Sequence, residues 1–399
     1  ELALDGVLRG RSGWQWTARD AKGDLLLGPW TVQADPVSGY DVVLSLDLVI
    51  QGVAEDALAW GVEKFHAKGG SIVVMDPATG AVLAMANRPD FDPNRPGHVK
   101  PESRRNRSIT DLLEPGSIFK IVTAAALLEE GAVKPEERFF CENGSFHTVA
   151  KHILHDHRPH GWLTFADVIR YSSNIGTSKA AQRLSPEVLY RYIRAFGFGQ
   201  PTGIELRGEI SGMVHPPARW SKLSPYIIPI GQEVGVTPIQ LAKMLSTVAN
   251  GGWVVEPYLV ERIQTPDGTV IRRYGSGNRQ RLLQTATVEA LQTMLISVVE
   301  SGTGRLANVQ GLTVAGKTGT AQKLEPNGRY SHSRYVASFV GYGPVPDPRI
   351  VVVVLIDEPR PLYFGGVVAA PIFRRMVQDL ASYWNLRDVS PSYTLARLP

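Results

Sequence analysis

Apolar residues recur every three or four positions from residue 46 to residue 65, until a Lys-Gly-Gly sequence at 68–70 interrupts the pattern. This spacing predicts a helix. Two apolar runs follow, at 71–76 and 81–86, separated by a Pro-Ala-Thr-Gly turn. Short apolar runs on either side of a turn are typical of a β-hairpin. A sheet therefore begins beside the first helix.

The rest of the chain divides into a helical middle and a mixed C-terminal region. Between about 110 and 260 the pattern predicts helices, with strand signals only near Phe139 and Phe146. Strands near both ends with helices between them predict an α/β fold whose sheet is discontinuous in sequence, with an all-α insertion. The expected helices are 118–128, 165–184, 187–196, 238–250, 286–300 and 367–384, and the further strands are 311–320, 334–343 and 349–357.

The composition is that of a globular protein and argues against a nucleic-acid binder. Hydrophobic residues make up 43% of the 399 residues, and the net charge of +4 is spread along the chain. No apolar run approaches the roughly 20 residues of a membrane-spanning helix. Because the chain starts with Glu1 and not with Met, we expect a trimmed fragment. Its one cysteine, Cys141, excludes an internal disulfide.

The first candidate for chemistry is the Ser-x-x-Lys pair of Ser117 and Lys120. A Pro-Gly turn precedes Ser117 and an apolar run follows it, which predicts that Ser117 starts a buried helix with Lys120 on the same face. Apolar surroundings lower the pKa of a lysine, so its neutral amine could accept the serine proton. The alternative is that Ser117 is a helix cap and Lys120 a surface charge.

Two further motifs carry polar groups that could face the same cleft. Ser172 and Asn174 lie two residues apart in a predicted tight loop, where they could serve catalysis or only cap a helix. The second motif is Lys317-Thr318-Gly319-Thr320 in a predicted strand. Its charge and hydroxyls reach one cleft only if the strand is an edge, and the alternative is an edge strand whose lysine guards against aggregation.

Together, in this order, the three motifs match the Ser-x-x-Lys and Lys-Thr-Gly set of penicillin-binding proteins and class A β-lactamases. From about Tyr40 to about Leu380 the chain also resembles the class B penicillin-binding proteins, of the division and sporulation type. This resemblance implies a penicillin-binding or serine β-lactamase-like transpeptidase fold, with an antiparallel sheet flanked by helices. The segments that carry the resemblance are 106–111, 114–117, 171–176, 231–238, 316–322 and 338–341.

The resemblance also implies two domains. Residues 1–42 would be the remnant of a β-rich, non-catalytic pedestal, and residues 43–399 the transpeptidase domain. Within that domain we expect an α/β part at about 43–110 and 280–399 and a mostly helical part at about 111–279.

The family mechanism assigns roles to these residues. Ser117 would attack the peptide bond between the last two D-alanines of a peptidoglycan stem peptide while Lys120 takes its proton. The backbone N–H groups of Ser117 and Thr320 would hold the oxyanion. Ser172 would pass a proton to the departing D-alanine, and Asn174 would bond the stem peptide. Lys317, Thr318 and Thr320, with Gly319 between them, would bind the terminal carboxylate, which a β-lactam also presents.

The resemblance implies a location and partners as well. We expect a septal cross-linking enzyme anchored in the bacterial cytoplasmic membrane, with its catalytic domain on the periplasmic or extracytoplasmic side. Its partners would be stem peptides, β-lactam antibiotics, a membrane glycosyltransferase and division proteins. Three alternatives stay open, namely a β-lactamase, a DD-carboxypeptidase and a non-catalytic division scaffold.

One loop holds several potential metal ligands. They are Cys141, His147, His152, His155 and Asp156, followed by His157 and His160. Their spacing fits no zinc pattern, so we expect a polar loop near the active site, with a Zn²⁺ site as the alternative. We expect no organic cofactor.

Overall fold

The computed structural model contains one central antiparallel sheet, with strand order β14-β15-β16-β6-β7. It describes residues 2–26, 28, 31–95, 97, 99–149, 151–275, 277, 279–325 and 329–385. The strands of the central sheet are β6 Gly69–Met75, β7 Val82–Arg88, β14 Ala315–Leu324, β15 Tyr330–Gly343 and β16 Ile350–Asp357.

Strand β16 shows why this sheet lies in the middle of the molecule. All eight of its residues are buried, because side chains alternate between two covered faces. Val351 and Val353 pack into a core with the helical part, whereas Val352 and Val354 pack into a second core on the opposite face. Helices α2 (Leu48–Lys64) and α11 (Gly365–Tyr383) cover that opposite face.

The helical part packs against the other face of the sheet through α9. Its helices, with the short α3 at its border, are α3 Arg107–Thr110, α4 Lys120–Glu129, α5 Phe165–Arg170, α6 Asn174–Ala181, α7 Pro186–Ala195, α8 Ser224–Ile227, α9 Pro238–Ala249 and α10 Thr285–Glu300. The 3-10 turns are η2 Pro101–Arg104, η3 Gly116–Phe119, η4 Glu142–Gly144, η5 Pro217–Arg219, η6 Ile228–Ile230 and η7 Arg305–Ala307.

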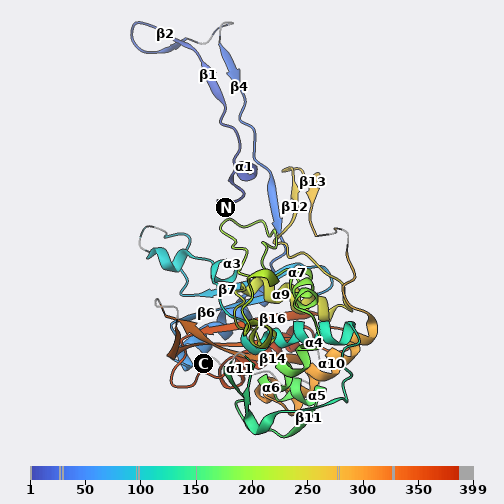
Figure 1. Cartoon of the computed structure of the whole chain (residues 1–399). Coiled ribbons are helices and arrows are strands. Elements are labelled where there is room, and N and C mark those ends of the chain that lie inside the picture. The colour runs from blue at the N-terminus through green and yellow to red at the C-terminus, as the bar shows by residue number, and fades with distance from the viewer. Residues whose placement is uncertain are drawn as a thin grey trace.

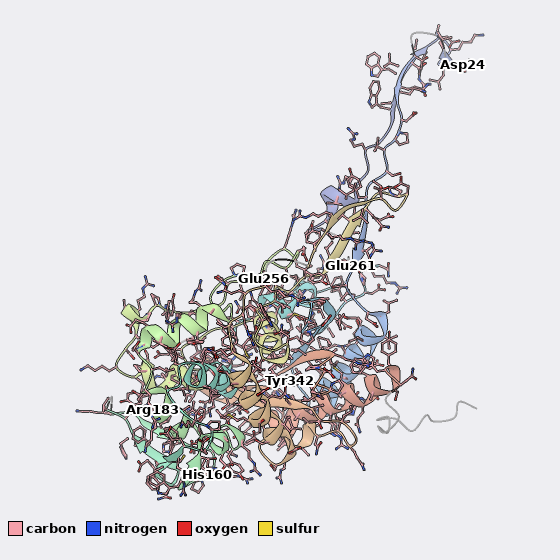
Figure 2. All side chains as sticks on the ribbon, turned by 90° about the vertical axis from the view of Figure 1, so that its right-hand side faces the viewer. Asp24, His160, Arg183, Glu256, Glu261 and Tyr342 are labelled. Carbon is pink, nitrogen blue, oxygen red and sulfur yellow. The ribbon has the colours of Figure 1, made fainter. Side chains whose placement is uncertain are left out.

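A thin two-stranded arm stands away from this body (Figure 1). Figure 2 labels Asp24 at the tip of the arm and His160 at the opposite end of the molecule, with Tyr342 between them in the body. The arm contains α1 Asp5–Leu8, β1 Trp14–Trp16, β2 Ala18–Arg19, β3 Leu25–Leu26 and β4 Val32–Ala34. At its base, β5 Asp41–Leu44 joins β12 Val260–Gln264 and β13 Val270–Arg273 in a three-stranded sheet.

The predicted hairpin, the three C-terminal strands and most of the predicted helices are confirmed, with shifted ends. The single helical stretch expected at 165–184 is wrong, because the chain breaks between α5 and α6 where Ser172 has a φ of +60°. The prediction also missed β10 Ile153–His155 and β11 Trp162–Thr164, which are too short to show an alternating pattern. None of the helices among the described residues is long and apolar enough to cross a membrane.

Candidate active site

The turn that holds Ser117 packs closely against the edge strand β14, and a glycine on each side of the contact allows this approach. Ser117 lies in η3, directly before α4, and is partly exposed. A Cβ on Gly116, whose φ is +51°, would lie 2.9 Å from the Thr320 carbonyl oxygen. A Cβ on Gly319 would lie 3.0 Å from the Pro115 carbonyl oxygen and 2.9 Å from Ile118. Larger side chains at these two glycines would push the turn and the strand apart.

Lys120 is completely buried beneath this turn. Its amine donates to the Ser172 carbonyl at 2.6 Å, to the Ser172 hydroxyl at 3.2 Å and to Asn174 Oδ1 at 2.7 Å. These hydrogen bonds run to the Ser172 loop rather than to Ser117, although the sequence predicts that the amine reaches Ser117. Burial lowers the pKa of Lys120 to about 7, against smaller raising effects of Asp156 and Cys141.

Lys317 approaches the same hydroxyl from strand β14. Its side chain is fully buried and donates to Ser172 Oγ at 2.8 Å. Burial lowers its pKa well below the usual value, and the neighbouring charge of Lys120 lowers it further. Ser172 therefore joins the two buried amines, one from α4 and one from β14.

Strand β14 is an edge of the central sheet, as its predicted role in a cleft requires. Thr318 Oγ1 lies 2.8 Å from Thr303 Oγ1, and Thr320 Oγ1 accepts a hydrogen bond from the Gly365 N–H at 3.0 Å. Thr303 was missed by the sequence analysis. It lies in a Ser-Gly-Thr-Gly turn after α10, a small polar sequence that also suits an ordinary loop.

Hydrogen bonds to Asp156 fix the position of the Ser172–Asn174 loop. Its carboxylate accepts from Ser173 Oγ at 2.6 Å, from the Asn174 N–H at 2.5 Å and from the Ile175 N–H at 3.0 Å. In addition, Asn174 Nδ2 donates to the His155 carbonyl at 2.9 Å. Asp156 thus fixes the start of α6, a role that the sequence alone did not indicate.

The remaining residues of the possible zinc loop have other contacts. Cys141 is buried, and its sulfur lies 3.4 Å from Ser173 Oγ. His155 Nδ1 forms a hydrogen bond with Ser145 Oγ at 3.1 Å. The His152 carbonyl accepts a hydrogen bond from the Thr148 hydroxyl. His147 is the last residue of strand β9 (Ser145–His147). Within the described part of the chain, no three His, Cys, Asp or Glu residues are grouped so that they could hold a metal ion.

The structure therefore brings together the residues of all three motifs. A partly exposed serine lies beside an edge strand, and two buried amines with lowered pKa values meet at one hydroxyl. Such an arrangement suits acyl transfer through a serine ester, because a neutral amine can accept a hydroxyl proton at neutral pH.

Comparison with known proteins gives one consistent family. Residues 70–378 match the family model of the penicillin binding protein transpeptidase domain. The chain is 33% identical over 399 residues to the "Probable peptidoglycan D,D-transpeptidase PenA" of Neisseria flavescens, covering 99% of this chain and 95% of that protein. It is 36% identical to the "Stage V sporulation protein D" of Bacillus subtilis, covering 95% of this chain and 59% of that protein.

A solved structure agrees with these relatives. Penicillin-binding protein 3 of Mycobacterium tuberculosis in complex with aztreonam superimposes with a TM-score of 0.83 at 33% identity, covering 94% of this chain and 88% of that one. The fold is therefore the penicillin-binding, serine β-lactamase-like fold expected from the sequence. The chain spans about three fifths of the length of most of its curated relatives.

Proposed function

Because the chain belongs to the penicillin-binding protein transpeptidase family, with class B members among its relatives, we propose that it is a serine D,D-transpeptidase acting through Ser117. The observation that carries this proposal is the pair of buried amines, Lys120 and Lys317, that meet at the Ser172 hydroxyl. Burial lowers the pKa of Lys120 to about 7, so a large fraction of this amine is neutral near pH 7, which is the condition for a lysine to act as a base.

In the proposed reaction, Ser117 Oγ attacks the carbonyl carbon between the last two D-alanines of a stem peptide, and Lys120 takes the serine proton. The oxyanion lies between the backbone N–H groups of Ser117 and Thr320. The C–N bond then breaks, and the proton reaches the leaving nitrogen through Ser172, whose hydroxyl lies 3.2 Å from the Lys120 amine. An amine of a second stem peptide next attacks the ester carbonyl, the C–O bond to Ser117 breaks, and the proton that the amine loses returns to Ser117 Oγ.

Substrate binding in this proposal uses the two walls of the cleft. Asn174 bonds the stem peptide, and Lys317, Thr318 and Thr320 bind its terminal carboxylate beside Gly319, which admits close approach. A β-lactam would acylate Ser117 in the same way, because it presents a similar carboxylate. The reaction uses Lys120 as its base and needs no metal or organic cofactor.

We propose a role in septal or spore cell-wall synthesis, and one relative is named for sporulation. We propose that the intact protein is held in the bacterial cytoplasmic membrane with this domain on the outer side. There it would work with a membrane glycosyltransferase and with division proteins.

Labelling with a fluorescent penicillin, followed by mapping of the modified peptide, tests the proposal. We expect one long-lived adduct per chain on Ser117 and none in Ser117→Ala. Rapid release of hydrolysed penicillin would favour a β-lactamase, and hydrolysis of a stem peptide without transfer to an amine would favour a carboxypeptidase. No adduct with folded protein would favour a non-catalytic scaffold.

A further inference from the structure

We propose that Thr303 is a positioning residue that directs the hydroxyl proton of Thr318 toward the carboxylate of the substrate. The inference rests on the proposed function, because it assigns the Thr318 hydroxyl to a bound carboxylate. Thr303 belongs to none of the three motifs, and it lies 15 residues before Thr318 in the sequence.

The direction of the hydrogen bond between Thr303 and Thr318 decides which proton is left for the substrate. The two hydroxyl oxygens are 2.8 Å apart, so one of them donates to the other. A threonine hydroxyl has one proton to donate and two lone pairs to accept with. If Thr318 donated to Thr303, no Thr318 proton would be left for an anion. If Thr303 donates to Thr318, the Thr318 proton is free for a carboxylate, and the chain of hydrogen bonds strengthens that contact.

The neighbouring Thr320 shows the same arrangement with a donor of known direction. Its Oγ1 accepts from the Gly365 N–H at 3.0 Å, and a backbone N–H can only donate. The Thr320 proton is therefore also available to the cleft. Thr318 and Thr320 carry the two hydroxyls of this strand that could meet the carboxylate. In our proposal each hydroxyl accepts a hydrogen bond from outside the strand, from Thr303 or from Gly365, and keeps its own proton for the substrate.

The backbone of Thr303 is held by two segments of the site, and its side chain meets a third, strand β14. Its N–H donates to the Arg170 carbonyl at 3.3 Å, and Arg170 lies two residues before Ser172. A Cβ on Gly302 would lie 2.4 Å from that same carbonyl. A Cβ on Gly366, near the start of α11, would lie 2.3 Å from the Thr303 carbonyl oxygen. Thr303 is therefore held between the Ser172 loop, β14 and α11, while its side chain is exposed.

The experiment compares second-order acylation rates for benzylpenicillin and for its methyl ester, which lacks the charged carboxylate. Thr303→Val keeps the shape of the side chain but lacks the hydroxyl donor. Its acylation rate should fall roughly tenfold with penicillin and less than about twofold with the ester. Thr303→Ser should retain most of the wild-type rate. Ser301→Ala, on the same turn, is the matched control and should leave both rates unchanged, because Ser301 Oγ bonds only the Ser297 carbonyl of its own helix. If Thr303→Val does not unfold cooperatively, Thr303→Ala replaces it.

A double-mutant cycle separates this role from a purely structural one. In a Thr318→Val background, Thr303→Val should cost nothing further, because the proton that it directs is gone. Unchanged penicillin acylation in Thr303→Val, an equal loss with the ester, or fully additive losses in the cycle would each overturn the inference. Failure of the wild-type chain to react with penicillin at all would instead overturn the proposed function and this inference with it.

Discussion

Replacing Asp156 by asparagine tests how buried charges set the pKa of Lys120. In the folded protein, burial lowers this pKa from 10.5 to about 7, and the Asp156 carboxylate opposes that change. A fall from 10.5 to about 7 raises the neutral fraction of Lys120 at pH 7 from about one in three thousand to about one half. The acylation rate of the wild type should therefore rise with pH up to about 7 and level off above it.

The expected effect of Asp156→Asn follows from the sign of the charge. Without the carboxylate, the protonated form of Lys120 is less stable, so its pKa falls and the rise in rate moves to lower pH. One neighbouring charge typically shifts a pKa by about one or more, so we expect a displacement of about one pH unit. Cys141, the other ionisable group that raises the pKa of Lys120, stays in place.

The assay is the second-order rate of fluorescent-penicillin labelling between pH 5 and pH 9. Asp167→Asn is the matched control, because Asp167 also accepts a hydrogen bond from a side-chain hydroxyl near a helix start but pairs with Arg170. It should leave the position of the rise unchanged. The plateau rate of Asp156→Asn is expected to fall as well, because asparagine cannot accept from Ser173 and Asn174 with two oxygens. A rate independent of pH in the wild type, or a rise displaced to higher pH in Asp156→Asn, would refute the reasoning.

Three further predictions concern the walls of the cleft and the sheet. Gly319→Ala should reduce penicillin acylation by tenfold or more in a labelling assay, since its Cβ would lie 2.4 Å from Ser338 Oγ, and a wild-type rate would contradict this. Lys317→Met should abolish most acylation yet leave the melting temperature equal or higher, because a buried amine is costly; a clearly lower melting temperature would speak against it. Arg107→Leu should lower the free energy of unfolding in urea by about 1–3 kcal/mol, because it removes a largely buried ion pair with Asp357 and a second pair with Asp111. The exposed pair of Arg9 and Asp5 should contribute less than about 1 kcal/mol.

Much of the fold could be predicted because its signals are local. The buried run of β16 and the turn after β6 each show their pattern within a few residues. The three-residue strands β10 and β11 are too short to show such a pattern. The pairing of β5 with β12 joins segments more than 200 residues apart, so periodicity could not predict it either. Tertiary pairing decides these elements.

The candidate site was predictable to the extent that short motifs carry it. The Ser-x-x-Lys, Ser-x-Asn and Lys-Thr-Gly motifs each show the residue types of acyl transfer, and the structure brings them into contact around the Ser172 hydroxyl. Asp156 and Thr303 carry no such signal, because an aspartate in a polar loop and a threonine in a glycine-rich turn are common. Their contacts with Asn174 and Thr318 exist only in three dimensions.

Lys120 and Lys317 differ from an isolated buried lysine because the charge of one affects the protonation of the other. Burial lowers the pKa of Lys317, and a charge on Lys120 lowers it further, because two positive charges so close together repel each other. Near neutral pH the pair therefore favours carrying at most one proton between them. The Ser172 hydroxyl lies 3.2 Å from the Lys120 amine and 2.8 Å from the Lys317 amine, in a residue whose φ is +60°. A proton accepted by Lys120 thus has a neutral neighbour and one hydroxyl through which to leave, so this backbone strain falls at a residue that the proposed proton path uses.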